Sequence, residues 1–196
     1  MKTAQSSDDQ TKITESENSR KAKRWFFSTL VLLTVLLIGT AAMVIFVDPY
    51  FHYHKPLSFL SYRIYEERYV NDGISRHFTY DAVITGTSMA QNFKTSELDE
   101  LFGTHSVKEP FSGADFRELS ENLNRTLQYG QEVKMVVMPL DYNALLQAAD
   151  WQKYEEYPTY LYDNNIFNDA RYVWNKAIFY HGVVADLLRT VSGEPS

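Results

Sequence analysis

Residues 81–89, with the sequence DAVITGTSM, decide the fold class of this chain. An apolar run with two β-branched residues ends at Gly86, and small polar residues follow at once. A short apolar run bounded by a glycine is typical of a strand buried on both faces of a parallel sheet. We therefore expect a strand over 82–85 and, directly after it, a turn that presents Ser88.

Two further strands are predicted along the chain. Residues 106–111 form a weaker candidate, because Pro110 lacks the amide hydrogen that a sheet ladder needs. Residues 133–138, VKMVVM, form the clearest strand and are followed by Pro139. A helical stretch separates each strand from the one before it.

The helical stretches are recognised by their caps and their period. Ser96 and Asp99 form a capping box of the Ser-x-x-Asp kind, which opens a short helix that ends at Gly103. From Phe116 to Leu127, apolar residues repeat at i, i+3, i+7 and i+11, as in an amphipathic helix. The order strand, helix, strand, helix, strand predicts an α/β fold with a parallel sheet and right-handed crossovers.

The pattern is weaker past residue 143. Leu145 and Leu146 suggest a short helix, and a longer helix is expected over about 168–188. Between them, residues 154–162 are rich in tyrosine. Such rings either stack on the sugars of a wall polymer or pack within the protein, and packing is the preferred interpretation.

The longest uncharged stretch runs from Trp25 to Val47 and is almost entirely apolar. A helix of this length spans roughly 34 Å, which is enough to cross a hydrocarbon core of about 30 Å. Four basic residues within 20–24 precede it, so the positive-inside rule keeps this end cytoplasmic. Aromatic residues flank both ends, including residues 50–53, at positions where rings favour the membrane interface.

A cleaved signal peptide is the alternative interpretation of this stretch. Residues 40–42, Thr-Ala-Ala, are a weak cleavage site, but the apolar run is longer than the roughly 7–15 residues of a signal peptide. A retained anchor in the cell membrane is therefore the preferred interpretation. It divides the chain into a disordered cytoplasmic tail (1–24), a transmembrane helix (25–47), a juxtamembrane segment (48–80) and an extracytoplasmic α/β domain (81–196).

Composition narrows the possible functions. The chain has 196 residues, a net charge of −6 and no cysteine, which excludes disulfides, thiol catalysis and thiolate metal sites. Its acidic balance argues against a nucleic-acid binder. His52 and His54 alternate as two ligands on a strand would, yet a polar collar at the membrane is the preferred interpretation. We expect neither a metal site nor a cofactor.

Small and polar residues follow each predicted strand, at 86–88, 112–114 and 140–143. Ligands of open α/β sheets bind beyond the carboxyl ends of the strands. A serine in a strand-to-helix turn has an exposed hydroxyl, and the helix start offers backbone N–H groups to an oxyanion. Ser88 is therefore a candidate nucleophile, and Gly113 would let a second backbone N–H approach the same point.

Residues 84–89, ITGTSM, resemble the first sequence block of the SGNH (GDSL-like) hydrolase superfamily, in which a strand runs into Gly-x-Ser. The resemblance implies a flavodoxin-like α/β fold, here with a partial sheet and flanking helices, and ester or acyl-transfer chemistry. Ser88 matches the nucleophile, whose own N–H contributes to the oxyanion hole. Gly113 matches the second-block glycine, the next oxyanion donor.

After the third predicted strand, this chain departs from the usual third block of the superfamily. Residues 140–143 are LDYN in place of Gly-x-Asn-Asp, and Asn143 is the candidate for the third oxyanion donor. Asn92, four residues after Ser88, is a competing polar group. Asn92 and Asp141 are the candidates for substrate binding.

The wider stretch 48–175 is similar to a group of membrane-anchored envelope proteins of Gram-positive bacteria. The shared landmarks are DPYFHYH at 48–54, GTSMAQNF at 86–93 and YPTYLY at 157–162. The resembling proteins continue beyond a point such as Ser196, so we expect this chain to be a truncated or split version of a longer fold.

The catalytic base of the superfamily is missing. It belongs to a late Asp-x-x-His block, and no aspartate of this chain has a histidine three residues later. His105 precedes the second strand, at the wrong end of the sheet, and His181 lies in the last predicted helix. A serine without a base is a poor nucleophile.

Three functions are compatible with these patterns. The first is hydrolysis or acyl transfer on esters of a cell-envelope glycan, with Ser88 as the nucleophile. The second is a non-catalytic envelope protein that keeps the fold and binds a wall polymer or a partner protein. The third is a structural anchor within an export or wall-assembly complex. The expected partners are the lipid bilayer and an envelope glycan, and nucleic acid is not among them.

Overall fold

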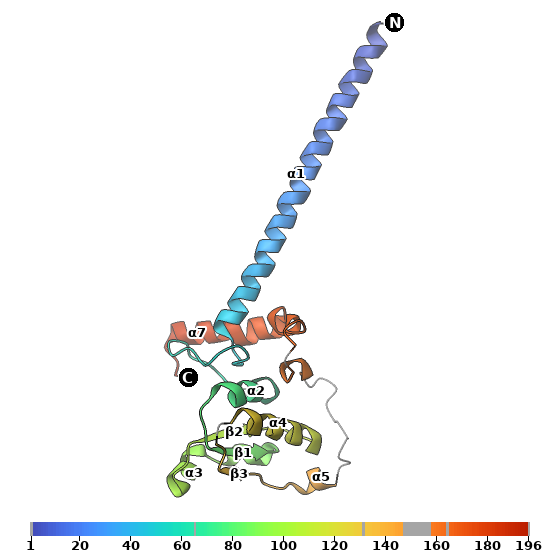
Figure 1. The fold of residues 1–196 in the computed structure, drawn as a ribbon. Coiled ribbons are helices and arrows are strands. Elements are labelled where there is room, and N and C mark those ends of the chain that lie inside the picture. The colour runs from blue at the N-terminus through green and yellow to red at the C-terminus, as the bar shows by residue number, and fades with distance from the viewer. Residues whose placement is uncertain (1, 65, 131, 147–157, 164, 196) are drawn as a thin grey trace. The chain divides into compact units, whose positions relative to one another are not determined.

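The chain divides into two compact units, Met1–Ala42 and Met43–Ser196. The first unit is part of one long helix, and the second is an α/β domain (Figure 1). For residues 2–17, 143 and 144 only the backbone is described. The computed structural model describes residues 2–64, 66–130, 132–146, 158–163 and 165–195.

Helix α1 (Lys2–Val47) contains one segment, Asn18–Val47, that is long and apolar enough to cross a membrane. A signal sequence near an N-terminus can satisfy the same criterion of length and composition. The backbone is helical from Lys2, whereas residues 1–24 were predicted to be disordered. A helix that is already nucleated gains one hydrogen bond for each added residue, which favours its extension into a polar tail.

The sheet contains three parallel strands in the order β2-β1-β3. They are β1 (Ala82–Gly86), β2 (Ser106–Pro110) and β3 (Met135–Val137). The α/β class and the parallel sheet are therefore confirmed. Strand β1 lies in the middle and all five of its residues are buried, as its apolar run predicts. Strand β3 was predicted to be the clearest strand, yet it has three residues and is only partly buried.

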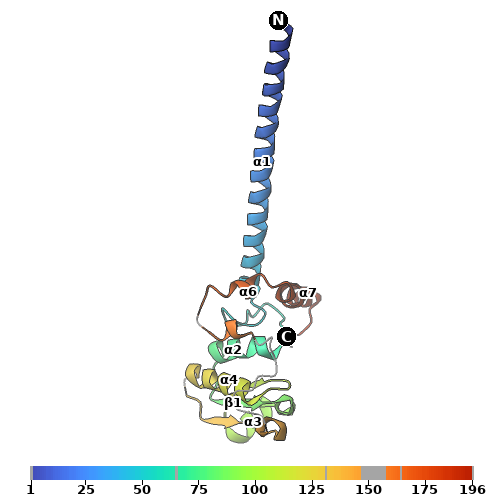
Figure 2. The same cartoon turned by 90° about the vertical axis from the view of Figure 1, so that its right-hand side faces the viewer.

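Helices cover both faces of the sheet. Helices α2 (Glu67–His77) and α4 (Phe116–Tyr129) lie on one side, and α3 (Thr95–Phe102) lies on the other (Figures 1 and 2). Residues 71–73, Asn-Asp-Gly, have the composition of a turn, yet they lie inside α2 and are buried. Gly73 lets α2 approach the preceding chain, since a Cβ there would lie 2.4 Å from the carbonyl oxygen of Tyr50.

Helices α4 and α3 have different residues at their N-termini. Asp115 caps α4 through a capping box with Glu118, whose N–H donates to Asp115 Oδ1 (2.8 Å). The box predicted for Ser96 and Asp99 was wrong, because α3 begins one residue earlier and its N-cap is Lys94. Asp99 instead accepts the backbone N–H of Ser106 (2.8 Å), which ties α3 to β2.

The predicted helix over about 168–188 is broken into pieces. Asn175 interrupts it, because its Oδ1 accepts the N–H of Ala177 (2.8 Å) and restarts the helix. The pieces after the sheet are α5 (Tyr142–Leu145), the short helix η2 (Thr159–Leu161), α6 (Ala170–Val173), the π-helix η3 (Ile178–Val184) and α7 (Ala185–Ser192).

A buried carboxyl group, Glu109 of β2, joins the sheet to α2 and α4. Its oxygens accept hydrogen bonds from Ser75 Oγ (3.0 Å), Asn122 Nδ2 (2.8 Å) and Thr126 Oγ1 (2.6 Å). The Glu109 residue is fully buried, and this burial raises the pKa of its carboxyl group to about 7. Sequence patterns gave no sign of this polar core, because its members are up to 51 residues apart.

The raised pKa of Glu109 predicts that the domain loses stability as the pH rises from 4.5 to 7. Below pH 4.5 the folded and unfolded chains both hold the proton, whereas between 4.5 and 7 only the folded chain holds it. The free energy of unfolding is expected to fall by about 3 kcal/mol over this interval. Thermal unfolding of the detergent-solubilised chain at pH 4.5 and 8 measures the loss.

The matched variant is Glu109→Gln, which keeps the side-chain shape and cannot titrate. This variant is expected to lose much less stability between pH 4.5 and 8 than the wild type. Burial also raises the pKa of Asp186, to about 6, but that contribution is the same in both proteins and cancels in the difference. Equal losses in the two proteins would contradict the assignment.

Buried ion pairs reinforce the contact between α2 and α4. Arg68 binds Glu118 through two nitrogens, with Nε–Oε1 2.7 Å and Nη2–Oε2 2.9 Å. Asp72 lies between Arg76 (2.8 Å) and Arg125 (2.5 Å). Burial raises the pKa of Asp72 although both arginines oppose that shift. Removing one member of such a cluster leaves a buried charge without its partner.

Asp48, the first residue after α1, organises the junction between this helix and the domain. Its carboxylate is fully buried and accepts the backbone N–H groups of His52 (3.0 Å), Tyr53 (2.7 Å) and His54 (3.0 Å). It also accepts the hydroxyl of Tyr172 (2.8 Å). Asp48 has φ 45°, a left-handed conformation that aspartate tolerates better than most residues.

The aromatic residues after α1 do not form the predicted interfacial collar. Tyr50 and Phe51 are 3% and 1% exposed, so they belong to the core of the domain. Their rings pack on other aromatic rings, with Phe51 5.1 Å from Tyr62 and Tyr50 5.2 Å from Tyr69. The apolar character of this stretch therefore reflects core packing rather than contact with lipid.

Candidate active site

Ser88 is exposed at the carboxyl end of β1, as predicted. The strand ends at Gly86 with φ 144°, a conformation that favours glycine, and a Cβ there would lie 3.1 Å from the Cβ of Ala90. The short helix η1 (Ser88–Asn92) starts at once, and the N–H of Ala90 donates to the carbonyl of Thr87 (2.9 Å). The sharp turn thus directs the Ser88 side chain to solvent while Ala90 is buried.

The turn after β2 lies next to the Ser88 turn. Gly113 is exposed with φ 61°, so its backbone adopts a conformation that other residues rarely take. Gln91 Nε2, three residues after Ser88, donates to Ser112 Oγ (2.9 Å). The N–H of Phe111 donates to the carbonyl of Gly86 (2.9 Å). These bonds bring the two turns together at one edge of the sheet.

The segment after β3 also reaches this edge. Thr87 Oγ1 donates to Asp141 Oδ2 (3.2 Å). Because Thr87 directly precedes Ser88 in the chain, this bond places Asp141 beside the Ser88 turn. Asn143 belongs to α5, and its side chain lies outside the described part of the chain. Asn92 is exposed, and its Nδ2 lies 3.4 Å from the carbonyl of Met89 within its own turn. The structure therefore brings Ser88, Gly113 and Asp141 to one sheet edge.

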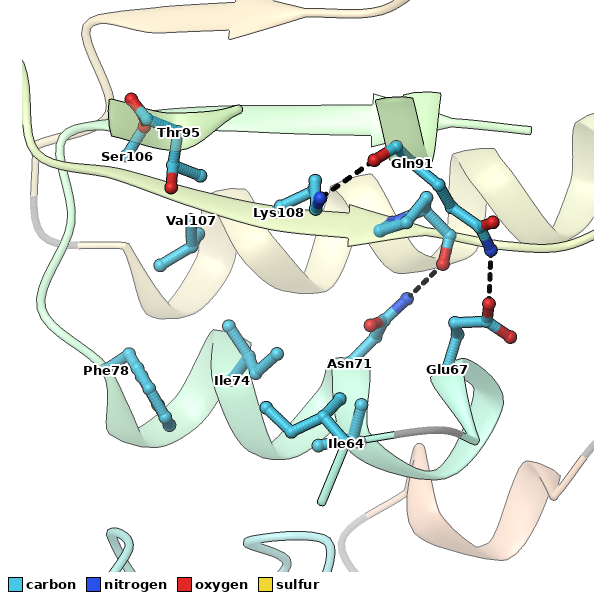
Figure 3. A pocket seen from close by; sticks show the side chains of 12 residues that line it. Ile64, Glu67, Asn71, Ile74, Phe78, Gln91, Thr95, Ser106, Val107 and Lys108 are labelled. Carbon is cyan, nitrogen blue, oxygen red and sulfur yellow. Dashed lines mark hydrogen bonds between the residues drawn. The ribbon is translucent and has the colours of Figure 1, made fainter. Parts of the chain in front are cut away.

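A cavity of about 550 Å³ adjoins this edge, between α2 and β2 (Figure 3). Figure 3 shows Ile74 of α2 and Phe78, directly after α2, facing Val107 of β2 across an apolar interior. At its polar end Gln91 Nε2 donates to Glu67, and Ser112 Oγ donates to the same carboxylate (3.2 Å). Because Gln91 and Ser112 also join the two turns, the polar end of the cavity is continuous with the Ser88 edge.

Arg68 and Glu118 support the Gly113 turn, and sequence reasoning missed both. Arg68 Nη2 donates to the carbonyl of Ser112 (3.1 Å) while the same guanidinium holds Glu118. The pair is 50 residues apart in sequence, so no local pattern could have indicated it. The bidentate contact with Glu118 neutralises the guanidinium charge, so Arg68 holds the turn in place rather than adding a net charge beside it.

The histidines of the juxtamembrane segment are engaged away from Ser88. His52 Nε2 lies 3.3 Å from Asp169 Oδ1. The two ring nitrogens of His54 lie within 3.1 Å of backbone carbonyls, and His77 Nε2 lies 3.4 Å from the carbonyl of His52. The two histidines that alternate like metal ligands, His52 and His54, thus have different partners.

The other two histidines also lie elsewhere. The backbone N–H of His105 donates to Asp81 Oδ1 (2.6 Å), where β1 and β2 begin, so His105 is at the opposite end of the strands from Ser88. His181 is exposed on η3. None of the described contacts of the five histidines involves the Ser88 or Gly113 turns.

No known protein family, curated protein or solved structure matches this chain. The geometry alone therefore has to indicate the chemistry. An exposed serine hydroxyl beside a glycine turn suits attack on an acyl carbonyl, because the developing oxyanion could be bound by backbone N–H groups. The same polar edge and adjoining cavity also suit binding of an acylated ligand without chemistry.

Proposed function

We propose that this protein is a single-pass, membrane-anchored, SGNH-like hydrolase or acyltransferase of the cell envelope, with Ser88 as its nucleophile. The observation that carries the proposal is the exposed Ser88 at the strand end, held beside the Gly113 turn through Gln91 and Ser112. The strand order 2-1-3 supports it, because flavodoxin-like sheets begin with this order.

The proposed chemistry assigns one role to each residue of the edge. Ser88 Oγ attacks the acyl carbonyl, forms an acyl-serine ester and releases the alcohol, which takes up the serine proton. The N–H groups of Ser88 and Gly113 bind the oxyanion. Asp141 is a positioning residue, since it fixes Thr87 directly before the nucleophile. Asn92 and Asn143 remain candidates for contact with the substrate or the oxyanion.

The proposed location follows from the charge pattern around α1. The basic residues of 20–24 stay in the cytoplasm, the segment within α1 crosses the membrane, and the domain from Asp48 onward is extracytoplasmic. An ester-bearing envelope glycan is the substrate class that such a domain meets. Protease shaving of intact cells would test the orientation, and protection of the domain would contradict it.

Binding without catalysis is the second candidate function. The contacts of the histidines favour it, because their described partners all lie away from Ser88 and a serine hydroxyl needs a base to become a strong nucleophile. In that case the sheet edge and the cavity beside α2 hold an acylated polymer or a partner protein.

Covalent labelling distinguishes the two candidates. A fluorophosphonate probe forms a phosphonyl ester on an activated serine and releases fluoride. Ser88 is the only serine of the tryptic peptide 77–94, so mass spectrometry of that peptide locates the adduct. We expect the adduct on 77–94 in the native, detergent-solubilised full chain and not after heat denaturation.

Two other outcomes of the labelling have clear meanings. An adduct on another peptide would remove Ser88 from its proposed role. Absence of any adduct, together with retention of the native chain on purified wall polymer, would establish the binding function instead.

A further inference from the structure

The continuous helix η3–α7, residues 178–192, has one buried and one exposed face, and the exposed face is mainly apolar but includes His181. Tyr180, Leu188 and Val191 are 56%, 62% and 86% exposed and share one helix face by their spacing. The opposite face is buried and includes Ile178, Gly182, Val183 and Asp186. A soluble domain usually exposes the polar face of such a helix.

The buried face of this helix rests on the chain that directly follows α1. A Cβ on Gly182 would lie 2.6 Å from Pro49 Cγ, so glycine allows the helix to touch the second residue after α1. Further along, the N–H of Ser61 donates to Thr190 Oγ1 (2.8 Å). The helix is therefore fixed beside the end of the apolar α1 segment, with its apolar face turned away from the domain.

Other exposed apolar residues continue this surface. Phe46, in the last turn of α1, is 59% exposed, and its ring lies 6.4 Å from that of Phe59, which is 61% exposed. Phe59 is two residues from Ser61, which bonds to the helix. Exposed rings thus lie at the final turn of α1 and in the chain segment that, two residues after Phe59, bonds to helix η3–α7.

We propose that the exposed face of η3–α7, together with Phe59, lies on the outer leaflet of the membrane that α1 crosses. Interfacial helices bury an apolar face about 5–10 Å deep at the boundary between headgroups and acyl chains. Lipid is the occupant that fits, because the apolar surface is continuous with the last turn of the proposed transmembrane segment. This inference rests on the proposed membrane anchor and is independent of the Ser88 chemistry.

Site-directed fluorescence quenching tests the inference in the full chain. The protein has no cysteine, so a thiol-reactive NBD label attaches only to a cysteine that is introduced at the chosen position. The test variants are Leu188→Cys and Val191→Cys, and the matched control is Leu101→Cys, which is 76% exposed on α3. Each is reconstituted in vesicles of phosphatidylglycerol and phosphatidylcholine, with or without a lipid that carries a nitroxide near the top of its acyl chain.

We expect the nitroxide lipid to quench labels at 188 and 191 at least about threefold more than the label at 101. A label at Leu33→Cys, in the middle of the apolar α1 segment, reports separately whether the anchor is inserted. Quenching at 33 with none at 188 and 191 would overturn the proposal that η3–α7 lies on the membrane and would leave the anchor in place. Absence of quenching at 33 would overturn the membrane anchor, and the surface proposal with it. Disulfide-linked dimers of the unlabelled Val191→Cys chain, in place of quenching, would show that a second copy covers this face.

Discussion

The Ser88→Ala variant is expected to lose esterase activity almost completely. The hydrolysis rate of p-nitrophenyl acetate should fall by about 10³-fold or more, because the variant cannot form the acyl-serine intermediate while its oxyanion donors remain in place. Ser88 is exposed, so the free energy of unfolding should change by no more than about 0.5 kcal/mol. Initial rates of the purified full chain in detergent and a thermal unfolding curve measure the two quantities.

Ser120→Ala is the matched control, since Ser120 is an exposed serine of α4 that takes no part in the sheet edge. It should retain the wild-type rate. If the wild type and Ser88→Ala hydrolyse the ester equally fast, Ser88 is not the nucleophile. If Ser88→Ala instead melts at a much lower temperature than the wild type, the loss of rate reflects unfolding rather than chemistry.

The Asp48→Ala variant is expected to show the largest loss of stability, about 4 kcal/mol or more. It leaves three backbone N–H groups and the Tyr172 hydroxyl without their shared acceptor, and hydrogen bonds to a charged group contribute about 1.5–3 kcal/mol each. Alanine also tolerates the left-handed backbone at φ 45° poorly. For a domain of this size the melting temperature should fall by about 10 °C.

Two graded variants test the account of Asp48. Asp48→Asn keeps one acceptor oxygen and the left-handed preference, so its loss should be less than half that of alanine. Tyr172→Phe removes a single hydroxyl donor and should cost about 1.5 kcal/mol. An Asp48→Ala protein that melts within about 2 °C of the wild type would contradict the account.

The elements that depend on local patterns were predictable from the sequence. The apolar run of β1 identifies a buried surface directly, and the alternation of strands and helices predicts the parallel sheet. The apolar period of 116–127 predicts helix α4 but not its buried face, because Phe116 and Leu127 are 40% and 48% exposed while Glu118, Asn122 and Thr126 are buried. The strand order β2-β1-β3 was not predicted.

Helix α2 was missed because polar residues, Asn71, Asp72 and Ser75, are buried in it beside the apolar ones. Asp72 is stabilised by Arg125 and Ser75 by Glu109, partners 53 and 34 residues away, so no pattern within α2 indicates that these residues face a core.

The candidate site was predictable in position and less so in detail. Parallel strands bring their carboxyl ends to one edge, so the proximity of Ser88, Gly113 and Asp141 follows from topology once the strands are identified. The contacts that fix this edge involve Gln91. Its role depends on how far its side chain extends toward the neighbouring turn, which its position in the sequence does not indicate. The adjoining cavity depends on α2 and was missed with it.

The hydrogen bond between Asp48 and Tyr172 has a consequence for biosynthesis. The two residues are 124 positions apart, so the junction after α1 cannot be completed until the ribosome has made Tyr172. Contacts that close such long loops form late and slow the folding of a chain. The segment that follows α1 therefore waits for a segment made much later in synthesis before it reaches its final conformation.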